Sequence, residues 1–127
     1  MVVSLRDRIV IANLGGYGNR RWRFRISDQD LSRERGKVEN YQPGKFGGLK
    51  TAGYFVVLES HVQSFLLSLT EIREIRYLRM THSYLEVEVE HLQDWVGVEG
   101  ILIRLMTKFF GLVEPVVKFE DQNHTVG

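Results

Sequence analysis

The residues with the most definite chemistry in this sequence are four arginines that fall within six positions. They are Arg20, Arg21, Arg23 and Arg25. From Arg21 onward they alternate with large apolar residues, and this period of two predicts a strand with one cationic face and one core face. The apolar residues are Trp22, Phe24 and Ile26. Side chains two apart on a strand stand roughly 6.6 Å from each other. The arginines therefore form a row, which suits a polyanion such as RNA.

A second group of cations lies in the polar, glycine-containing stretch of residues 28–50. The members that we assign as candidate RNA ligands are Arg33, Arg35, Lys37 and Lys45. We expect this stretch to be an inserted loop, and loops of such length in a small domain are usually functional or disordered. Two interpretations stay open, a solvated insertion and an arm that RNA orders.

Three glutamates alternate with apolar residues between positions 84 and 90. They are Glu86, Glu88 and Glu90. A row of acids repels itself without a pocket to gather it, so we expect a solvated or protein-facing strand face rather than a metal site. The same charges argue against RNA on that face. The spacing of the histidines does not indicate a metal site. The sequence also shows no nucleophile, general base and orienting residue at a spacing that would predict a catalytic site. We therefore expect neither enzymatic activity nor a cofactor.

Composition sets the broad class of protein. A chain of 127 residues, 43% of them hydrophobic, suits a single domain, which we place at residues 1–120 with a flexible tail at 121–127. The absence of cysteine excludes disulfides and thiolate metal sites. The formal net charge is only +1, so any nucleic-acid binding must come from local placement of charge.

Hydrophobic periodicity predicts the elements that must position these residues. Strands are expected at 5–14, 18–26, 52–58, 75–80 and 84–90, and the run 112–119 is expected to be an edge strand or a packed tail. The stretch 52–58 is the most apolar and is therefore expected to be central. The glycine-rich residues 15–19 predict a turn that joins the first two strands as a hairpin or one long bent strand.

Two amphipathic helices are expected as well. The first begins at Ser60, which together with Gln63 has the form of a capping box. The second spans 94–110, with Asp94 as N-cap and Gly111 beyond its end. Both have apolar residues at helical spacing along one stripe, so each can cover a sheet.

Three short motifs resemble those of one known family. Residues 18–26 fit a Gly-x-Arg-x-Leu-x-Tyr-x-Ile pattern without a gap, residues 53–55 fit a Gly-Tyr-Phe strand start, and residues 74–78 fit a motif that follows the next helix. Residues 13–15, Asn-Leu-Gly, resemble a motif that lies just before the first of these three in the mitochondrial members of the same family. In their order and spacing across residues 9–80, these motifs resemble the small-subunit ribosomal protein six family.

The resemblance implies an α+β fold, namely a ferredoxin-like antiparallel sheet with two helices on one face. The family follows the order βαββαβ, and this chain starts at what would be the second strand. We expect residues 84–110 to replace the missing first strand and helix, as in a circular permutation, with 84–90 between the strands at 52–58 and 75–80. The alternative is a separate chain that supplies the missing half.

The resemblance also implies a function. The chain would be a structural constituent of the small ribosomal subunit that binds the central domain of its rRNA together with ribosomal protein eighteen. The family pattern supports Arg20 and Arg76 as RNA contacts, whereas Arg21, Arg23 and Arg25 rest on the alternation alone. A mitochondrial ribosome is the expected location, with the bacterial cytoplasm as the alternative.

Three other functions stay open. The first is a free-standing RNA-binding or ribosome-assembly factor on the same fold. The second is an acylphosphatase-like enzyme, for which Asn19 and Arg20 are the adjacent candidates. The third is a purely protein-binding subunit, favoured if Arg21, Arg23 and Arg25 contact only carboxylates.

Overall fold

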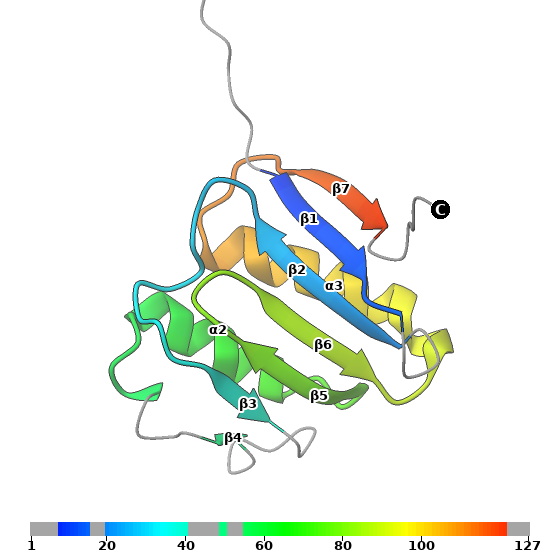
Figure 1. The fold of residues 1–127 in the computed structure, drawn as a ribbon, viewed down its shortest axis with the longest axis horizontal. Helices are drawn as coiled ribbons and strands as arrows, with labels where there is room; N and C mark the ends of the chain where they lie inside the picture. Colours follow the sequence, from blue (N-terminus) through cyan, green and yellow to red (C-terminus); the bar gives the residue numbers. More distant parts are fainter. Residues whose placement is uncertain (1–7, 16–19, 41–48, 51–54, 122–127) are drawn as a thin grey trace, which may run out of the picture.

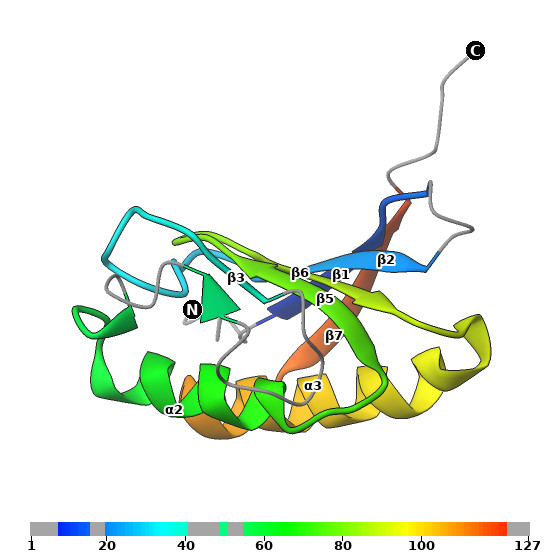
Figure 2. The same ribbon diagram turned by 90° about the horizontal axis from the view of Figure 1, so that it is seen from below.

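The computed structural model describes residues 8–15, 20–40, 49–50 and 55–121. It has an α+β fold with a seven-stranded sheet in the order β4-β3-β5-β6-β2-β1-β7 (Figure 1). The elements are β1 Arg8–Asn13, β2 Arg21–Ile26, β3 Val38–Asn40, β4 Leu49–Lys50, α2 Ser60–Thr70, β5 Ile75–Met80, β6 Leu85–Val89, the 3-10 turn η3 Leu92–Asp94, α3 Trp95–Phe109 and β7 Val116–Asp121. Helices α2 and α3 lie against the same face of the sheet (Figure 2).

The centre of the sheet is the antiparallel set β5-β6-β2-β1, and with α2 and α3 it is consistent with a ferredoxin-like fold. Strands β1 and β2 pair antiparallel as expected, and so do β5 and β6. The predicted turn between the first pair lies largely outside the described residues. Strand β6 takes the position next to β5 that the permutation requires, while the permutation itself stays a prediction.

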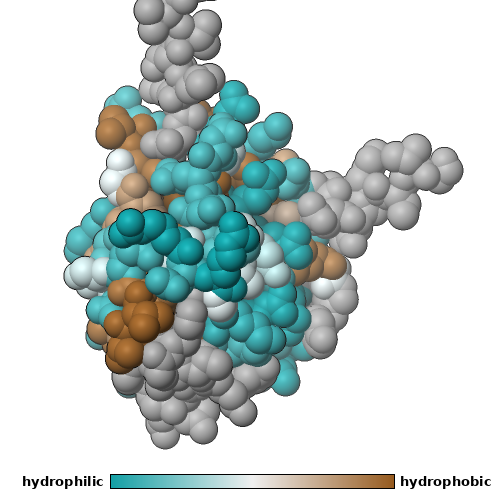
Figure 3. All heavy atoms as spheres, turned by 60° about the vertical axis from the view of Figure 1, so that its left-hand side comes forward, coloured by the Kyte–Doolittle hydropathy of each residue, from teal (hydrophilic) through white to brown (hydrophobic). Residues whose placement is uncertain are grey.

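The predicted central strand at 52–58 is wrong for its described part. Residues 55–58 form a turn that leads into α2, in which the Leu58 N–H donates to the carbonyl of Phe55 at 3.1 Å. Val56 and Val57 are 70% and 54% exposed. The view with the left-hand side of Figure 1 turned forward shows an apolar patch within a mostly hydrophilic surface (Figure 3). The neighbour of β6 is instead β2, whose alternating apolar residues match those of β6 across the ladder, with Trp22 opposite Val87.

The predicted loop at 28–50 contains two short strands. Strand β3 pairs antiparallel with β5, with Val38 opposite Met80, and β4 pairs with β3. Val38 and Leu31 of this stretch are buried at 0% and 1% exposure, so burial of these side chains and the ladder to β5 attach the segment to the sheet. Hydrophobic periodicity did not predict β3, because a strand of three residues is too short to show a period of two.

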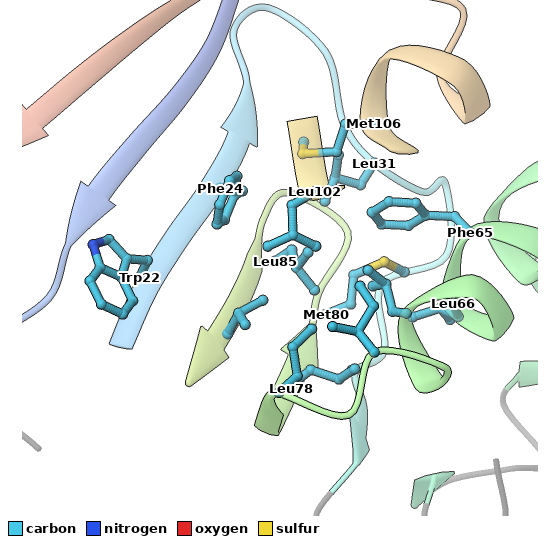
Figure 4. Packing of buried hydrophobic residues seen from close by; sticks show 14 of the residues in the cluster. Trp22, Phe24, Leu31, Phe65, Leu66, Leu78, Met80, Leu85, Leu102 and Met106 are labelled. Carbon is cyan, nitrogen blue, oxygen red and sulfur yellow. The ribbon is translucent and has the colours of Figure 1, made fainter. Parts of the chain in front are cut away.

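Both helices bury the stripes that their spacing predicts. Val62, Phe65, Leu66 and Leu69 of α2, and Val98, Leu102 and Met106 of α3, are at most 2% exposed. They meet the apolar side chains of β2, β5 and β6 in one core (Figure 4). The rings of Trp22 and Trp95 stack at 3.7 Å with an interplanar angle of 2°, which joins the N-terminal end of α3 to β2.

The predicted start is wrong for α2 and right for α3. Glu59, not Ser60, is the N-cap of α2, and the side chain of Gln63 donates to the carbonyl of Phe55 instead of closing a capping box. Asp94 is the N-cap of α3 as predicted, although its backbone is already in the α region and its side chain makes no capping hydrogen bond. Gly111 stands just beyond α3 with φ +64°, as expected of a glycine that ends a helix.

The last strand is an edge strand, as predicted, although it starts and ends later than expected. Strand β7 pairs parallel with β1, and Pro115 stands immediately before it, where a missing N–H removes no hydrogen bond from the ladder. Asp121 therefore belongs to the sheet, while 122–127 lie outside the described residues. Among the described helices, none is long and apolar enough to cross a membrane.

Candidate functional site on the open face of the sheet

The arginines of β2 lie on the face of the sheet that α2 and α3 leave open. Trp22, Phe24 and Ile26 are 6%, 0% and 2% exposed beneath the helices, which confirms the predicted alternation. Arg21, Arg23 and Arg25 must then point the other way. The ladder aligns two of them with acids, because Arg21 lies opposite Glu88 and Arg23 opposite Glu86 on β6.

Glu88 lies between two arginines. Its Oε1 is 3.0 Å from Nη2 of Arg21, and its Oε2 is 3.4 Å from Nε of Arg76. Arg76 also reaches Glu90 at 4.0 Å. The side chain of Glu88 is only 5% exposed, so the carboxylate is held by charge-assisted contacts rather than by water.

Glu86 lies between two other arginines. Its Oε1 is 3.5 Å from Nη2 of Arg23 and 3.2 Å from Nη2 of Arg79. Burial by itself lowers the pKa of Arg79, but Coulombic attraction to Glu86 and the hydrogen bond to the Tyr84 hydroxyl outweigh it, so the pKa of Arg79 lies above its ordinary value. This guanidinium therefore stays charged wherever the protein is folded.

Arg25 extends the pattern toward β7, where its Nη2 is 3.5 Å from Glu120. Arg20 contacts the same residue as Arg76 but at its backbone, because its Nη1 donates to the carbonyl of Glu90 at 3.0 Å, whereas Arg76 lies 4.0 Å from the Glu90 carboxylate. Asn19, the other half of the expected hydrolase pair, lies outside the described residues.

Two tyrosines complete this surface. The guanidinium of Arg21 lies 4.9 Å from the ring centre of Tyr77, and that of Arg23 lies 4.5 Å from the ring of Tyr84, both within the range of cation–π attraction. The Tyr77 hydroxyl donates to Glu39 on β3, which also pairs with Lys37 at 3.1 Å.

We refer to this surface as the arginine–glutamate face. It comprises Arg21, Arg23, Arg25, Arg76, Arg79, Tyr77, Tyr84, Glu86, Glu88 and Glu120. Its positive and negative side chains alternate across the strands, so the row of arginines is balanced by acids of the same chain. The guanidinium side chains nevertheless remain 22% to 49% exposed, and each arginine has five N–H donors, more than one carboxylate can use.

The prediction of a solvated face for the glutamates is wrong for Glu86 and Glu88, which are 5% and 4% exposed. All five residues of β6 are buried, and β6 lies between β5 and β2, so it is a central strand. The arginines of β2 and β5 cover the glutamates from both sides. Glu90, the third of the row, is exposed as expected. Within the described part of the chain, no group of three or more acids and histidines could hold a metal ion.

Two further predicted RNA ligands, Arg33 and Arg35, belong to a loop and not to the strands of this face. Arg33 and Arg35 are exposed in the connection between β2 and β3, and in the part of the chain that the structure describes neither makes an ion pair. This connection is tied to the start of α2, because Glu59 accepts hydrogen bonds from the Ser32 hydroxyl and the Arg33 N–H, both at 3.3 Å. Lys45 lies outside the described residues.

A shallow hollow of about 470 Å³ lies beside this connection. Its lining includes Arg33, Glu59, His61 and Phe110. His61 meets Phe110 edge-on at 5.4 Å. The hollow contains no arranged nucleophile and base, so its shape and residues indicate no reaction.

Sequence reasoning identified the arginines and the glutamates but missed Arg79, Tyr77 and Tyr84. Arg79 and Tyr77 alternate with buried residues on β5, and this period of two could have placed both on the open face. Comparison with protein-family models, curated proteins and solved structures finds no match to this chain.

Proposed function

We propose that this protein is a non-catalytic, structural subunit of a ribonucleoprotein particle, and that the arginine–glutamate face is its RNA-binding surface. One observation carries the proposal. Five arginines and two tyrosines share one open sheet face that neither α2 nor α3 covers. Guanidinium groups bind phosphates, and tyrosine rings provide surfaces for bases, so the chemistry of the face suits structured RNA.

The carboxylates of the face define the kind of RNA binding that we propose. A phosphate must share each guanidinium with an acid of the same chain, so binding is weaker than five free arginines would give. Arg76 is the best available donor, because its side chain, at 49% exposed, is the most exposed of the five, while its Nε lies 3.4 Å from Glu88 and 4.0 Å from Glu90. The exposed Arg33 and Arg35, neither of which makes an ion pair within the described residues, add further attraction for RNA.

The particle that we propose is the small ribosomal subunit, with the central domain of its rRNA and ribosomal protein eighteen as partners. This assignment rests on the three motifs of residues 9–80, and the mitochondrial location rests on the resemblance of residues 13–15 to the mitochondrial branch of the family. A particle constituent should remain with small subunits that are sedimented in high salt, whereas an assembly factor should wash off. Recovery of the protein only in the supernatant would contradict the assignment.

A second candidate function, a subunit that binds only protein, is favoured by one specific observation. Arg21, Arg23 and Arg25 each contact a carboxylate within the chain, at 3.0, 3.5 and 3.5 Å. A face whose charges are already balanced can also bind a polar surface of another protein, if that surface carries matching hydrogen-bond donors and acceptors.

An RNA titration distinguishes the RNA-binding function from the purely protein-binding one. Fluorescence anisotropy with a labelled central-domain rRNA transcript, repeated at several salt concentrations, should show binding whose affinity falls with salt. Arg76→Ala should weaken binding and reduce the salt slope by about one unit, the amount expected for one lost phosphate contact. The matched control is Arg104→Ala, an exposed arginine on α3, which lies on the other side of the sheet. Equal binding by both variants would refute the RNA surface and leave the protein-binding candidate.

A further inference from the structure

Among the described residues, β7 is the last strand of the sheet on its side. Within the described residues, β1 is the only strand that pairs with β7, so the other side of β7 presents backbone N–H and carbonyl groups along Val116–Asp121. Val116 and Phe119 are 40% and 64% exposed. An apolar strand at an open edge is a template for pairing with another strand.

The face on which each β7 side chain lies follows from its pairing with β1. Phe119 lies opposite Ile11, a core residue, so Phe119 belongs to the helix side of the sheet but extends past the core into solvent. Lys118 and Glu120 lie opposite Val10 and Ala12, so both belong to the open face. Lysine on an edge strand usually prevents pairing between copies, but here a glutamate stands two residues away on the same face.

We propose that β7 pairs antiparallel with β7 of a second copy of this chain, with Phe119 opposite Phe119 at the two-fold axis. In this register Lys118 of each copy lies opposite Glu120 of the other, and the two phenylalanine rings cover each other on the helix side. Side chains directly opposite in antiparallel strands have Cβ atoms about 4.5 to 5.5 Å apart, within reach of an ion pair. The edge is therefore self-complementary in charge and in apolar surface, as an isologous interface requires.

The other edge of the sheet lacks these properties. Strand β4 has only the two residues Leu49–Lys50, too short to hold a partner strand in register. The dimer thus forms through β7 alone and joins the sheets of two copies. Because Arg25 contacts Glu120 on the same open face, pairing at β7 would make the two arginine–glutamate faces continuous.

Sedimentation velocity over a range of protein concentrations tests the proposal. The wild-type chain should shift from monomer to dimer as concentration rises. Lys118→Glu should stay monomeric, because it places two pairs of like charges across the axis, and Phe119→Asp should do the same by placing two carboxylates face to face. Both positions are exposed, so the fold is expected to tolerate the changes, which circular dichroism verifies. Lys108→Glu on α3 is the matched charge reversal and should dimerise like the wild type.

Charge complementation gives the sharper result. A Glu120→Lys variant carries two lysines on the open face of this edge, and the Lys118→Glu variant carries two glutamates. Neither should self-associate, whereas an equimolar mixture should form a heterodimer. A wild-type chain that remains monomeric at all concentrations would overturn the proposal, and so would a Lys118→Glu variant that dimerises as well as Lys108→Glu.

Discussion

Glu86 provides the strongest test of how the arginine–glutamate face contributes to the fold. Its carboxylate is 5% exposed and lies 3.2 Å from Arg79 and 3.5 Å from Arg23. Glu86→Gln keeps the size and the acceptor oxygen of the side chain but removes the charge. Two guanidinium groups would then share a buried neutral amide, and their mutual repulsion would no longer be offset.

The expected cost is about 2 to 3 kcal/mol of unfolding free energy. Hydrogen bonds to charged groups contribute about 1.5 to 3 kcal/mol each, and breaking a fully buried pair costs about 3 to 5. We use the first, lower range, because the side chains of Arg79 and Arg23 are 30% and 34% exposed and water therefore screens part of their interaction with Glu86. Glu120→Gln is the matched control, since it removes the charge from a pair whose side chains are 41% and 40% exposed, and exposed pairs are worth at most about 1 kcal/mol.

Urea unfolding followed by tryptophan fluorescence measures both variants, because Trp22 and Trp95 stack in the core. With a urea slope of about 1 to 3 kcal/mol per molar, Glu86→Gln should lower the midpoint by roughly 1 M or more, and Glu120→Gln by clearly less. If the two variants lose the same stability, the buried carboxylate does not hold the sheet together and the reasoning is refuted.

Three further stability predictions follow from the same structure. Phe65→Ala should cost about 3 to 5 kcal/mol in urea unfolding, because the ring is fully buried between α2 and the sheet. Gly111→Ala should cost about 1 to 2 kcal/mol, because the residue has φ +64° and an L side chain is strained there. Gly97→Ala should instead stabilise the fold by about 0.5 to 1 kcal/mol, because Gly97 lies inside α3 and no atom lies within 4 Å of the added Cβ. A loss of stability in Gly97→Ala would contradict the argument for both glycines, in which the backbone conformation decides the sign of the effect.

Local pattern was enough to predict most elements of this fold. The alternation at β2 and β6 gave the correct core faces, although both faces of β6 are buried, and helical spacing gave the core stripes of α2 and α3. The failures were of three kinds. The short strands β3 and β4 were not predicted within the stretch 28–50. The apolar run at residues 52–58 was predicted to be a strand, whereas its described part forms a turn, because a short apolar run does not by itself establish a strand. The predicted N-cap of α2 was also wrong by one residue, because cap geometry depends on backbone angles that residue types do not fix.

The candidate site, like the fold, could be predicted from the sequence only in part. The sequence by itself determined that Arg21 and Arg23 share one face of a strand and that Glu86 and Glu88 share one face of another, since successive side chains on a strand must alternate. Whether these two faces meet depends on which strands are neighbours, and period-two alternation carries no information about neighbours. Only the tertiary structure placed β6 between β5 and β2 in a register that sets Arg23 opposite Glu86 across a separation of 63 residues. That pairing changed the arginine row from a set of free cations into a balanced surface.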